Sequence, residues 1–217
     1  MTAAGGPGVS PGVDGDVLPG AGDPEGFGPE VLGLLERVLP SDDGSPIEGD
    51  YRPAAVLIAL FVREDTLHVV LTKRTDNVRT HQGQVSFPGG SFEAADGTLE
   101  LTALREAHEE VGLDPAHVRV LGVLDDLPTF VSGFQVRPFV AEIPHPYEFV
   151  HDVTEVDHVF SPALEIFADP SRRREEVRER DGREFVMTSY DVDGNVVWGA
   201  TARMLEQLVD RIAAARV

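Results

Sequence analysis

The sequence predicts an α/β fold in which a mixed β-sheet is sandwiched between helices. Segments rich in β-branched and aromatic residues interleave with segments of helical periodicity, but the two kinds do not alternate strictly, which disfavours a doubly wound parallel sheet. No internal repeat is visible in the sequence. The 217 residues, of which 41% are hydrophobic, are enough for one domain with a full core.

The first 27 residues are rich in glycine, proline and aspartate and lack apolar periodicity, so they cannot bury enough surface to offset the entropy lost on ordering. A flexible tail over residues 1–27 and a folded domain over residues 28–217 are therefore expected. The N-terminus has neither the basic nor the apolar region of a secretion signal, and the longest apolar run, residues 54–62, is too short to span a bilayer. These features predict a cytoplasmic protein without membrane contact.

Charge and cysteine content restrict the function further. The formal net charge of -20 disfavours binding to nucleic acid or to anionic membranes, because the field of the protein repels polyanions. A substrate that carries phosphate therefore needs a local group of cations. Because the chain has no cysteine, it has no thiolate nucleophile, and any metal ion must be held by oxygen or imidazole ligands.

The N-terminal elements follow from their hydrophobic patterns. The segment PEVLGLLERVLP carries apolar residues at helical spacing and predicts the first helix. The runs AAVLIALFV (54–62) and LHVVLTKR (67–74), separated by the turn-like REDT, predict a hairpin or two adjacent buried strands. A short extended segment, QVSF, ends at Pro88, and Gly89-Gly90 then predicts a loop with backbone angles that other residues avoid.

The later elements are a helix, a series of strands and a final helix. A helix over about 98–111 is expected to end at Gly112, and its core-facing stripe comprises Leu101, Leu104, Ala107 and Val111. The charged segment at 171–184 predicts a solvated loop or a short helix. The segments VRVLGVLDDL and QVRPFVAEI predict two strands, which PTFVSGF joins. EFVMTSYDV and NVVW predict a hairpin that turns at Asp193-Gly194. An amphipathic helix is expected at 199–214.

The helix at 98–111 concentrates negative charge on one face. Glu106 and Glu110 are four residues apart and Glu109 lies three after Glu106, so like charges are neighbours at a cost of about 0.2–0.5 kcal/mol per pair. Arg105 can pair with Glu109, which leaves Glu106 and Glu110 adjacent without a counter-ion. Taken alone, the pattern is more typical of a solvated acidic face, as most charge runs are. It also suits a Mg²⁺ or Mn²⁺ site, because hard cations prefer carboxylate oxygens.

The segment FPGGSFEAADGTLELTALREAHEEVGL, residues 87–113, resembles the Nudix box, the strand-loop-helix signature G-x5-E-x7-R-E-U-x-E-E-x-G-U of Nudix hydrolases, in which U is aliphatic. From Arg105 onward the match is complete, except that Ala107 stands at the first aliphatic position. In the front half, Asp96 replaces the glutamate, and eight residues rather than seven separate it from Arg105. The resemblance favours the metal site over the solvated face and implies the Nudix fold.

The longer loop with Asp96 is similar to the coenzyme A pyrophosphatase branch of the Nudix family. That branch carries a second signature, approximately L-L-T-x-R-S-x-x-L-R-x-H-x-G-x-V-x-F-P-G-G, and residues 70–90 read VLTKRTDNVRTHQGQVSFPGG, with conservative departures at Val70, Thr75 and Val78. The segment VWGATARML at 197–205 also resembles the branch. This resemblance implies hydrolysis of the pyrophosphate bond of coenzyme A or acyl-CoA to 3′,5′-ADP and (acyl-)phosphopantetheine.

The resemblance also implies roles for individual residues. Glu106, Glu109 and Glu110, with the carbonyl of Gly89, are the implied ligands of Mg²⁺ or Mn²⁺, and Arg105 orients Glu109. The general base stays open between one of these glutamates and a carboxylate from a later loop.

The residues around position 75 form a basic group in an acidic chain. Lys73, Arg74, Arg79 and His81 supply the local positive charge that a phosphorylated substrate needs, and guanidinium groups bind phosphate in a bidentate manner. Arg74, Arg79 and His81 are therefore candidate substrate ligands. The alternative for either arginine is a structural ion pair, and for the histidine a structural role.

Two rival functions fit the same residues. The chain could hydrolyse another nucleoside diphosphate derivative, such as a damaged nucleotide, ADP-ribose or a dinucleoside polyphosphate, or it could be a catalytically silent ligand-binding module. The intact glutamates argue against the silent module. In each case the expected partner is a nucleotide-type small molecule, and a homodimer is one possible assembly.

The 3′-phosphate of coenzyme A, which dephospho-coenzyme A lacks, provides a test of the basic group. We expect Arg74→Ala or Arg79→Ala to lower kcat/KM for coenzyme A by the equivalent of about 1.5–3 kcal/mol, the contribution of a hydrogen bond to a charged group, and to affect dephospho-coenzyme A much less. The measurement is kcat/KM for both substrates in each variant. Equal losses would exclude both arginines as 3′-phosphate ligands.

Overall fold

The computed structural model describes residues 27–42, 44, 50–75, 83–129, 133–180 and 182–216. The helices are α1 (Glu30–Val38), α2 (Leu99–Val111) and α3 (Gly199–Ala214), with short 3₁₀ helices η2 (Pro115–His117) and η3 (Leu164–Phe167). The strands are β1 (Arg52–Arg63), β2 (Thr66–Val69), β3 (Leu71–Arg74), β4 (Val85–Ser86), β5 (Gly89–Ser91), β6 (Arg119–Val123), β7 (Leu127–Thr129), β8 (Phe134–Glu142), β9 (Val156–Phe160), β10 (Arg173–Arg180), β11 (Arg183–Val192) and β12 (Asn195–Trp198).

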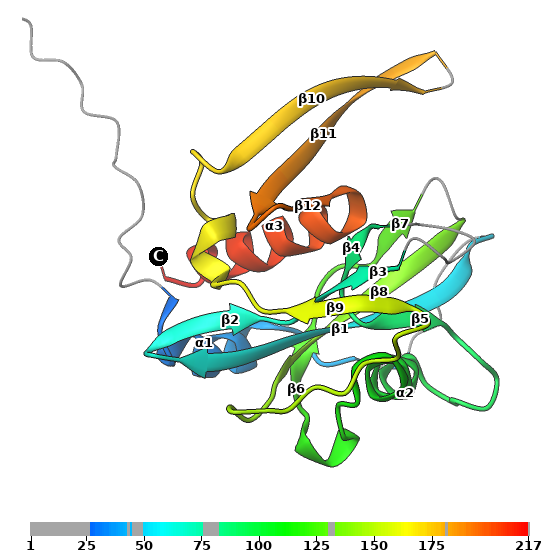
Figure 1. The fold of residues 1–217 in the computed structure, drawn as a ribbon, viewed down its shortest axis with the longest axis vertical. Coiled ribbons are helices and arrows are strands. Elements are labelled where there is room, and N and C mark those ends of the chain that lie inside the picture. Colours follow the sequence, from blue (N-terminus) through cyan, green and yellow to red (C-terminus); the bar gives the residue numbers. More distant parts are fainter. Residues whose placement is uncertain are drawn as a thin grey trace, which may run out of the picture.

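The central sheet is mixed and has helices on both faces (Figure 1), as predicted. Its strand order is β2-β1-β8-β6, with β5 also paired to β1 and β7 to β8. The β1–β8 pair is parallel and the other pairs are antiparallel. Alternate residues of β1 enter two cores: Ala54, Ile58 and Leu60 pack with α1 and α3, whereas Ala55, Leu57, Ala59 and Phe61 pack with α2. Burial on both faces explains the continuous apolar run of β1.

Two smaller sheets extend this core. The run 67–74 is two strands rather than one, because the chain leaves the central sheet after β2 and β3 pairs with β4 and β9 instead. The predicted loop or short helix at 171–184 is wrong: β10 and β11 form an antiparallel hairpin that projects from the body (Figure 1). Cross-strand pairing, such as Val177 opposite Val186, here overrides the charged composition that indicated a loop. The predicted hairpin at Asp193-Gly194 and the helix at 199–214 are confirmed.

The two glycines after Pro88 do not form the predicted loop. Gly89 and Gly90 belong to β5, opposite Val56 and Ala55 of β1, and neither has a positive φ. Because these two residues have no side chain, β1 and α2 can approach β5 closely. A Cβ atom on Gly89 would lie 2.4 Å from the carbonyl oxygen of Ala55, and one on Gly90 would lie 2.4 Å from Oε1 of Glu106. The glycines therefore let β5 lie tightly between β1 and α2.

Helix α2 begins and ends near the predicted positions. The Thr98 side chain accepts a hydrogen bond from the Leu101 amide at 3.2 Å, and Gly112 ends the helix with φ of 69°. The predicted core stripe is partly wrong, because Leu101 is 51% exposed, whereas Thr102 and Ala103 are buried. Small residues at this contact let α2 approach β1 closely, which turns the larger leucine outward.

The ends of the described chain pack together. Phe27, the last residue of the predicted tail, is buried, and the guanidinium group of Arg216 lies 5.6 Å from its ring centroid. The described helices include none with the length and hydropathy needed to cross a membrane.

The glycine contact can be tested by adding one methyl group. We expect Gly89→Ala to lower the free energy of unfolding by about 1–3 kcal/mol, because the added Cβ collides with backbone atoms of β1. The matched variant Gly33→Ala, within α1, should instead raise it by about 0.5–1 kcal/mol through helix propensity. Urea denaturation measures both. Equal stability of Gly89→Ala and the wild type would contradict the close approach.

Candidate functional site

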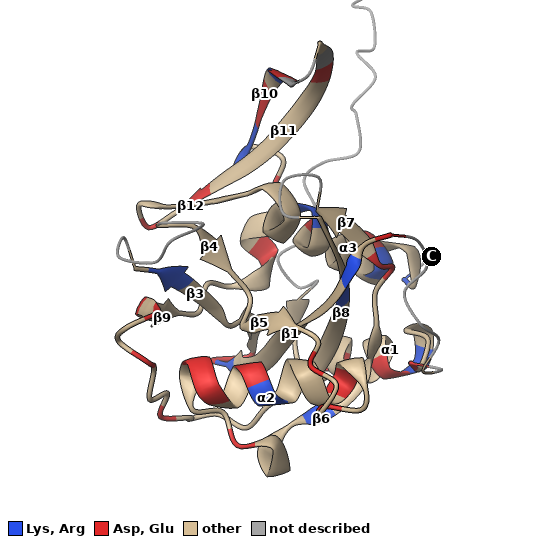
Figure 2. Cartoon of the chain, turned by 90° about the vertical axis from the view of Figure 1, so that its right-hand side faces the viewer, with Lys and Arg blue, Asp and Glu red and all other residues tan. Residues whose placement is uncertain are grey.

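Figure 2 shows acidic residues along α2 with a basic position among them, and α2 packs against the glycine-containing strand β5. The Glu106 carboxylate lies against Gly90, where any side chain would displace it. The Glu110 carboxylate accepts a hydrogen bond from the Gly89 amide, with Oε2 at 3.3 Å from the nitrogen. Close packing of the helix on β5 therefore places two carboxylates beside one short strand.

Glu110 is the most buried of the three glutamates, with a side chain 6% exposed. Its Oε1 lies 3.2 Å from Nη1 of Arg74, at the end of β3. Burial raises the pKa of Glu110 to about 7, although the charge of Arg74 and the hydrogen bond from Gly89 oppose this shift. The carboxylate is therefore held in a position where its negative charge is only partly compensated.

Arg105 bridges the other two glutamates. Its Nη1 lies 2.9 Å from Oε1 of Glu106 and 3.0 Å from Oε2 of Glu109. Burial raises the pKa of Glu106, and the charge of Arg105 acts against this rise. The predicted Arg105–Glu109 pair is confirmed, but the expectation that Glu106 and Glu110 lack counter-ions is wrong, because Arg105 also binds Glu106 and Arg74 reaches Glu110 from another strand.

Asp96 fixes the position of Arg105. The two side chains form a forked pair, with Nε at 2.7 Å from Oδ1 and Nη2 at 3.2 Å from Oδ2. The Thr102 hydroxyl and the Glu93 amide donate further hydrogen bonds to Oδ2 of Asp96, at 2.8 and 2.9 Å. The hydrogen bond from Arg105, above all, lowers the pKa of Asp96 from 3.8 to about 2. Asp96 is therefore ionised and fixes the position of Arg105, which in turn binds Glu106 and Glu109.

Glu155 is a site residue that the sequence pattern did not single out. It precedes β9, and its Oε2 lies 3.2 Å from Nη2 of Arg74. Its charge also contributes to the raised pKa of both Glu106 and Glu110, so it lies on their side of the helix. The segment before it has no recognisable motif. The pairing of β3 with β9 and the hydrogen bond from the Asp152 amide to the Glu110 carbonyl oxygen bring it here.

The structure thus brings most of the candidate residues together. Four candidate residues of α2 form one cluster with Arg74 and Gly89, and Asp96 and Glu155 complete this cluster. The four are Arg105, Glu106, Glu109 and Glu110. Arg79 and His81 lie outside the described residues.

The donor atoms fit a hard divalent cation. Glu106 and Glu110 present carboxylate oxygens beside Gly89 and Gly90, and a hard cation held by such oxygens completes its shell with water and substrate oxygens. Within the described ranges, no three acidic, histidine or cysteine side chains already converge as a metal-binding group. Glu109 points to Arg105, so it must turn from this arginine in order to join the other two.

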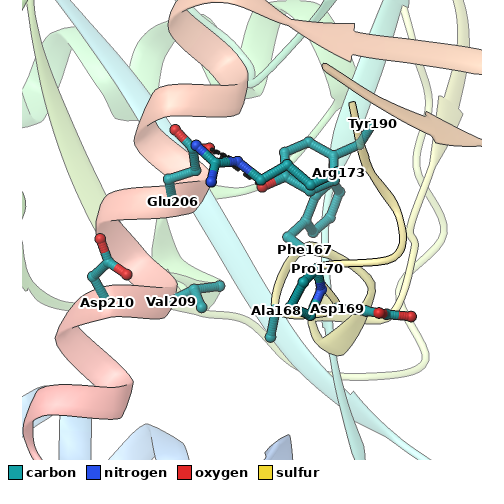
Figure 3. Close-up of a pocket in the computed structure, with 9 residues that line it drawn as sticks. All are labelled: Phe167, Ala168, Asp169, Pro170, Arg173, Tyr190, Glu206, Val209 and Asp210. Atoms are coloured by element: carbon teal, nitrogen blue, oxygen red, sulfur yellow. Dashed lines mark hydrogen bonds and ion pairs between the residues drawn. The ribbon is translucent and has the colours of Figure 1, made fainter. Parts of the chain in front are cut away.

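A separate cavity of about 280 Å³ lies between η3, the β10–β11 hairpin and α3 (Figure 3). Its arginine is already paired, because Nε of Arg173 lies 3.1 Å from Oε1 of Glu206. The Tyr190 hydroxyl donates to the same oxygen at 3.4 Å, and burial raises the pKa of this tyrosine to about 12. Because the charge of Arg173 is neutralised and three carboxylates line the cavity, the cavity suits a phosphorylated ligand less well than the cluster on α2.

Comparison with known proteins gives a consistent family. The NUDIX domain family matches residues 50–188. A Nudix hydrolase of Enterobacter sp. (strain 638), NudL, described as uncharacterized, is 39% identical over 161 residues, which are 74% of this chain and 83% of the relative. Nudix hydrolase 15, mitochondrial, of Arabidopsis thaliana is 38% identical over 183 residues, 80% of this chain and 63% of the relative. Among solved structures, a MutT/nudix family protein from Enterococcus faecalis has a TM-score of 0.51 at 14% identity, covering 78% of this chain and 65% of that one, which supports the fold.

The Asp96–Arg105 pair should make stability depend on pH. Because the pKa of Asp96 in the fold lies below its usual 3.8, the ionised carboxylate stabilises the fold at neutral pH, and this contribution is lost as the pH falls from about 4 to about 2. We expect Asp96→Asn to lower the free energy of unfolding by about 1.5–3 kcal/mol at pH 7. The difference from the wild type should shrink at acidic pH.

The control for this variant is Asp125→Asn, which removes an exposed partner of Arg211 and should change stability by less than about 1 kcal/mol. Urea denaturation at several pH values measures all three proteins. If both variants lose the same small amount of unfolding free energy, the Asp96–Arg105 pair contributes no more to stability than the exposed Asp125–Arg211 pair.

Proposed function

Because the chain belongs to the Nudix hydrolase family, we propose that it hydrolyses the pyrophosphate bond of coenzyme A or acyl-CoA to 3′,5′-ADP and (acyl-)phosphopantetheine. One contact carries this proposal. Arg74, from the segment at 70–90 that resembles the coenzyme A branch, lies 3.2 Å from Glu110 of the Nudix helix. The two motifs therefore meet in space, so the segment that sets the branch apart is placed to influence what the glutamates act on.

We assign the divalent cation, Mg²⁺ or Mn²⁺, to Glu106, Glu109 and Glu110 with the carbonyl of Gly89. Once bound there, such an ion would offset the charge of the diphosphate, polarise phosphorus and favour ionisation of the attacking water. The carboxylate oxygens of Glu106 and Glu110, which lie beside Gly89 and Gly90, support this assignment.

The remaining side chains of the site would orient these groups. Asp96 holds Arg105, and Arg105 in turn positions Glu106, whereas Glu109 must leave Arg105 to reach the cation. Glu155 is a carboxylate from a later loop, 51% exposed and close to the glutamates, which fits the role of general base toward a solvent water.

A substrate screen tests this proposal. Coenzyme A, ADP-ribose, NADH, diadenosine polyphosphates and 8-oxo-dGTP are incubated with Mg²⁺ or Mn²⁺, and the products are identified by mass. We expect the highest kcat/KM for coenzyme A or an acyl-CoA. Preferred cleavage of another substrate would place the chain with nucleoside diphosphate hydrolases of different specificity, and cleavage of none would indicate a silent binding module.

The cation ligands are tested in the same assay. We expect Glu110→Gln to lower kcat at least about 100-fold, as does the loss of a major electrostatic group in other enzymes. The control is Glu100→Gln, which removes the same charge from the first turn of α2 and should change kcat little. Full activity in EDTA, or in the Glu110→Gln enzyme, would refute the metal assignment.

A further inference from the structure

Arg74 differs from the buried Arg137 in the quality of its ion pairs. Arg137 is buried and binds Asp126 through two hydrogen bonds of 2.9 Å and Asp42 through one of 2.8 Å. Arg74 instead divides its fork between two carboxylates, with single contacts of 3.2 Å to Glu110 and 3.2 Å to Glu155. Charge-assisted hydrogen bonds are usually 2.7–2.9 Å long, so neither contact of Arg74 is optimal.

The backbone aims Arg74 at the glutamates although its contacts with them are loose. The pairing of β3 with β9 shifts register between Lys73 and Arg74, and such bulges turn a side chain away from the regular direction. The Arg74 amide donates to the carbonyl oxygen of Gln84 at 2.9 Å, which fixes the backbone at this point. The side chain of Arg74, by contrast, is 24% exposed, so its guanidinium group has access to partners other than the two glutamates.

A divalent cation at the glutamates would change the electrostatic balance of Arg74. Glu110 is too buried to be left without a positive partner, and Arg74 supplies one in the structure. A cation bound to Glu110 would replace that partner and would repel the guanidinium group. A diphosphate brought to the same cation carries negative oxygens, which suit the fork of an arginine.

We propose that Arg74 is an exchange residue, which neutralises Glu110 and Glu155 in the free protein and moves to the diphosphate of the substrate when a divalent cation takes Glu110. This proposal rests on the metal site assigned above. The exchange also frees Glu155 from its arginine at the moment when substrate is present. Arg74 therefore opposes binding of the cation alone and favours binding of the cation together with a diphosphate.

The test is to measure Mn²⁺ binding without substrate in the full chain, by isothermal titration calorimetry and by thermal melting. We expect Arg74→Gln to bind Mn²⁺ about three- to tenfold more tightly than the wild type, because a competing positive charge is removed. Without metal the variant should melt at a lower temperature, since Glu110 has lost its partner, and Mn²⁺ should raise its Tm more than it raises that of the wild type. With saturating Mn²⁺, the variant should bind ADP about tenfold more weakly.

Opposite effects on the cation and on ADP separate the exchange from simpler roles. An arginine that only stabilises the fold would leave Mn²⁺ binding unchanged or weaker, and one that only binds phosphate would weaken ADP binding without changing Mn²⁺ affinity. Either result overturns the exchange while the metal site stands, whereas a wild type that binds no Mn²⁺ overturns both.

Two further variants serve as controls in this test. Arg203→Gln removes the same charge from an exposed position on α3, and its Mn²⁺ affinity should equal that of the wild type. Arg74→Lys keeps the charge but cannot span two carboxylates, so its Mn²⁺ affinity should lie between those of the wild type and Arg74→Gln. If Arg74→Gln does not fold, the test rests on Arg74→Lys. A Mn²⁺ affinity of Arg74→Lys no tighter than that of the wild type then refutes the exchange.

Discussion

The close packing of α2 on the glycine strand β5 is the constraint from which the rest of the site follows. Side chains at Gly89 and Gly90 would collide with β1 and with Glu106, so only this pair of residues lets helix and sheet approach so far. The approach takes Glu106 and Glu110 out of water and raises the pKa of both. Carboxylates in such a position need positive partners, and the fold provides them from two sides.

The two arginines that meet this need are held in different ways. Arg105 belongs to α2 itself and is held by the buried side chain of Asp96 through a forked pair, of which one arm is 2.7 Å long. Arg74 comes from another sheet and makes only single, longer contacts. One side of the glutamate cluster is therefore rigid and the other adaptable, which is the combination expected where a charged ligand must enter without loss of the surrounding geometry.

The features that could be predicted from the sequence are those fixed by local residues. Thr98 and Gly112 set the ends of α2, and Asp193-Gly194 set the last hairpin, because caps and tight turns depend on a few neighbouring positions. The sheet covered by helices followed from the order of apolar patterns. The exposure of Leu101 could not be predicted in this way, because periodicity defines the apolar face of a helix but not how closely the helix packs on its sheet.

What the sequence did not reveal depends on pairing between distant strands. Arg74 lies 36 residues from Glu110 and 81 from Glu155. The β3–β9 ladder brings Arg74 near Glu155, and a hydrogen bond from the Asp152 amide to the Glu110 carbonyl oxygen ties the same segment to α2. Closing loops of this length costs entropy, whereas α2 is a local element. The acidic face of α2 is therefore set by its own residues, but its neutralisation by Arg74 needs the assembled domain. A peptide of α2 alone contains the three glutamates and Arg105 but not the counter-ion of Glu110.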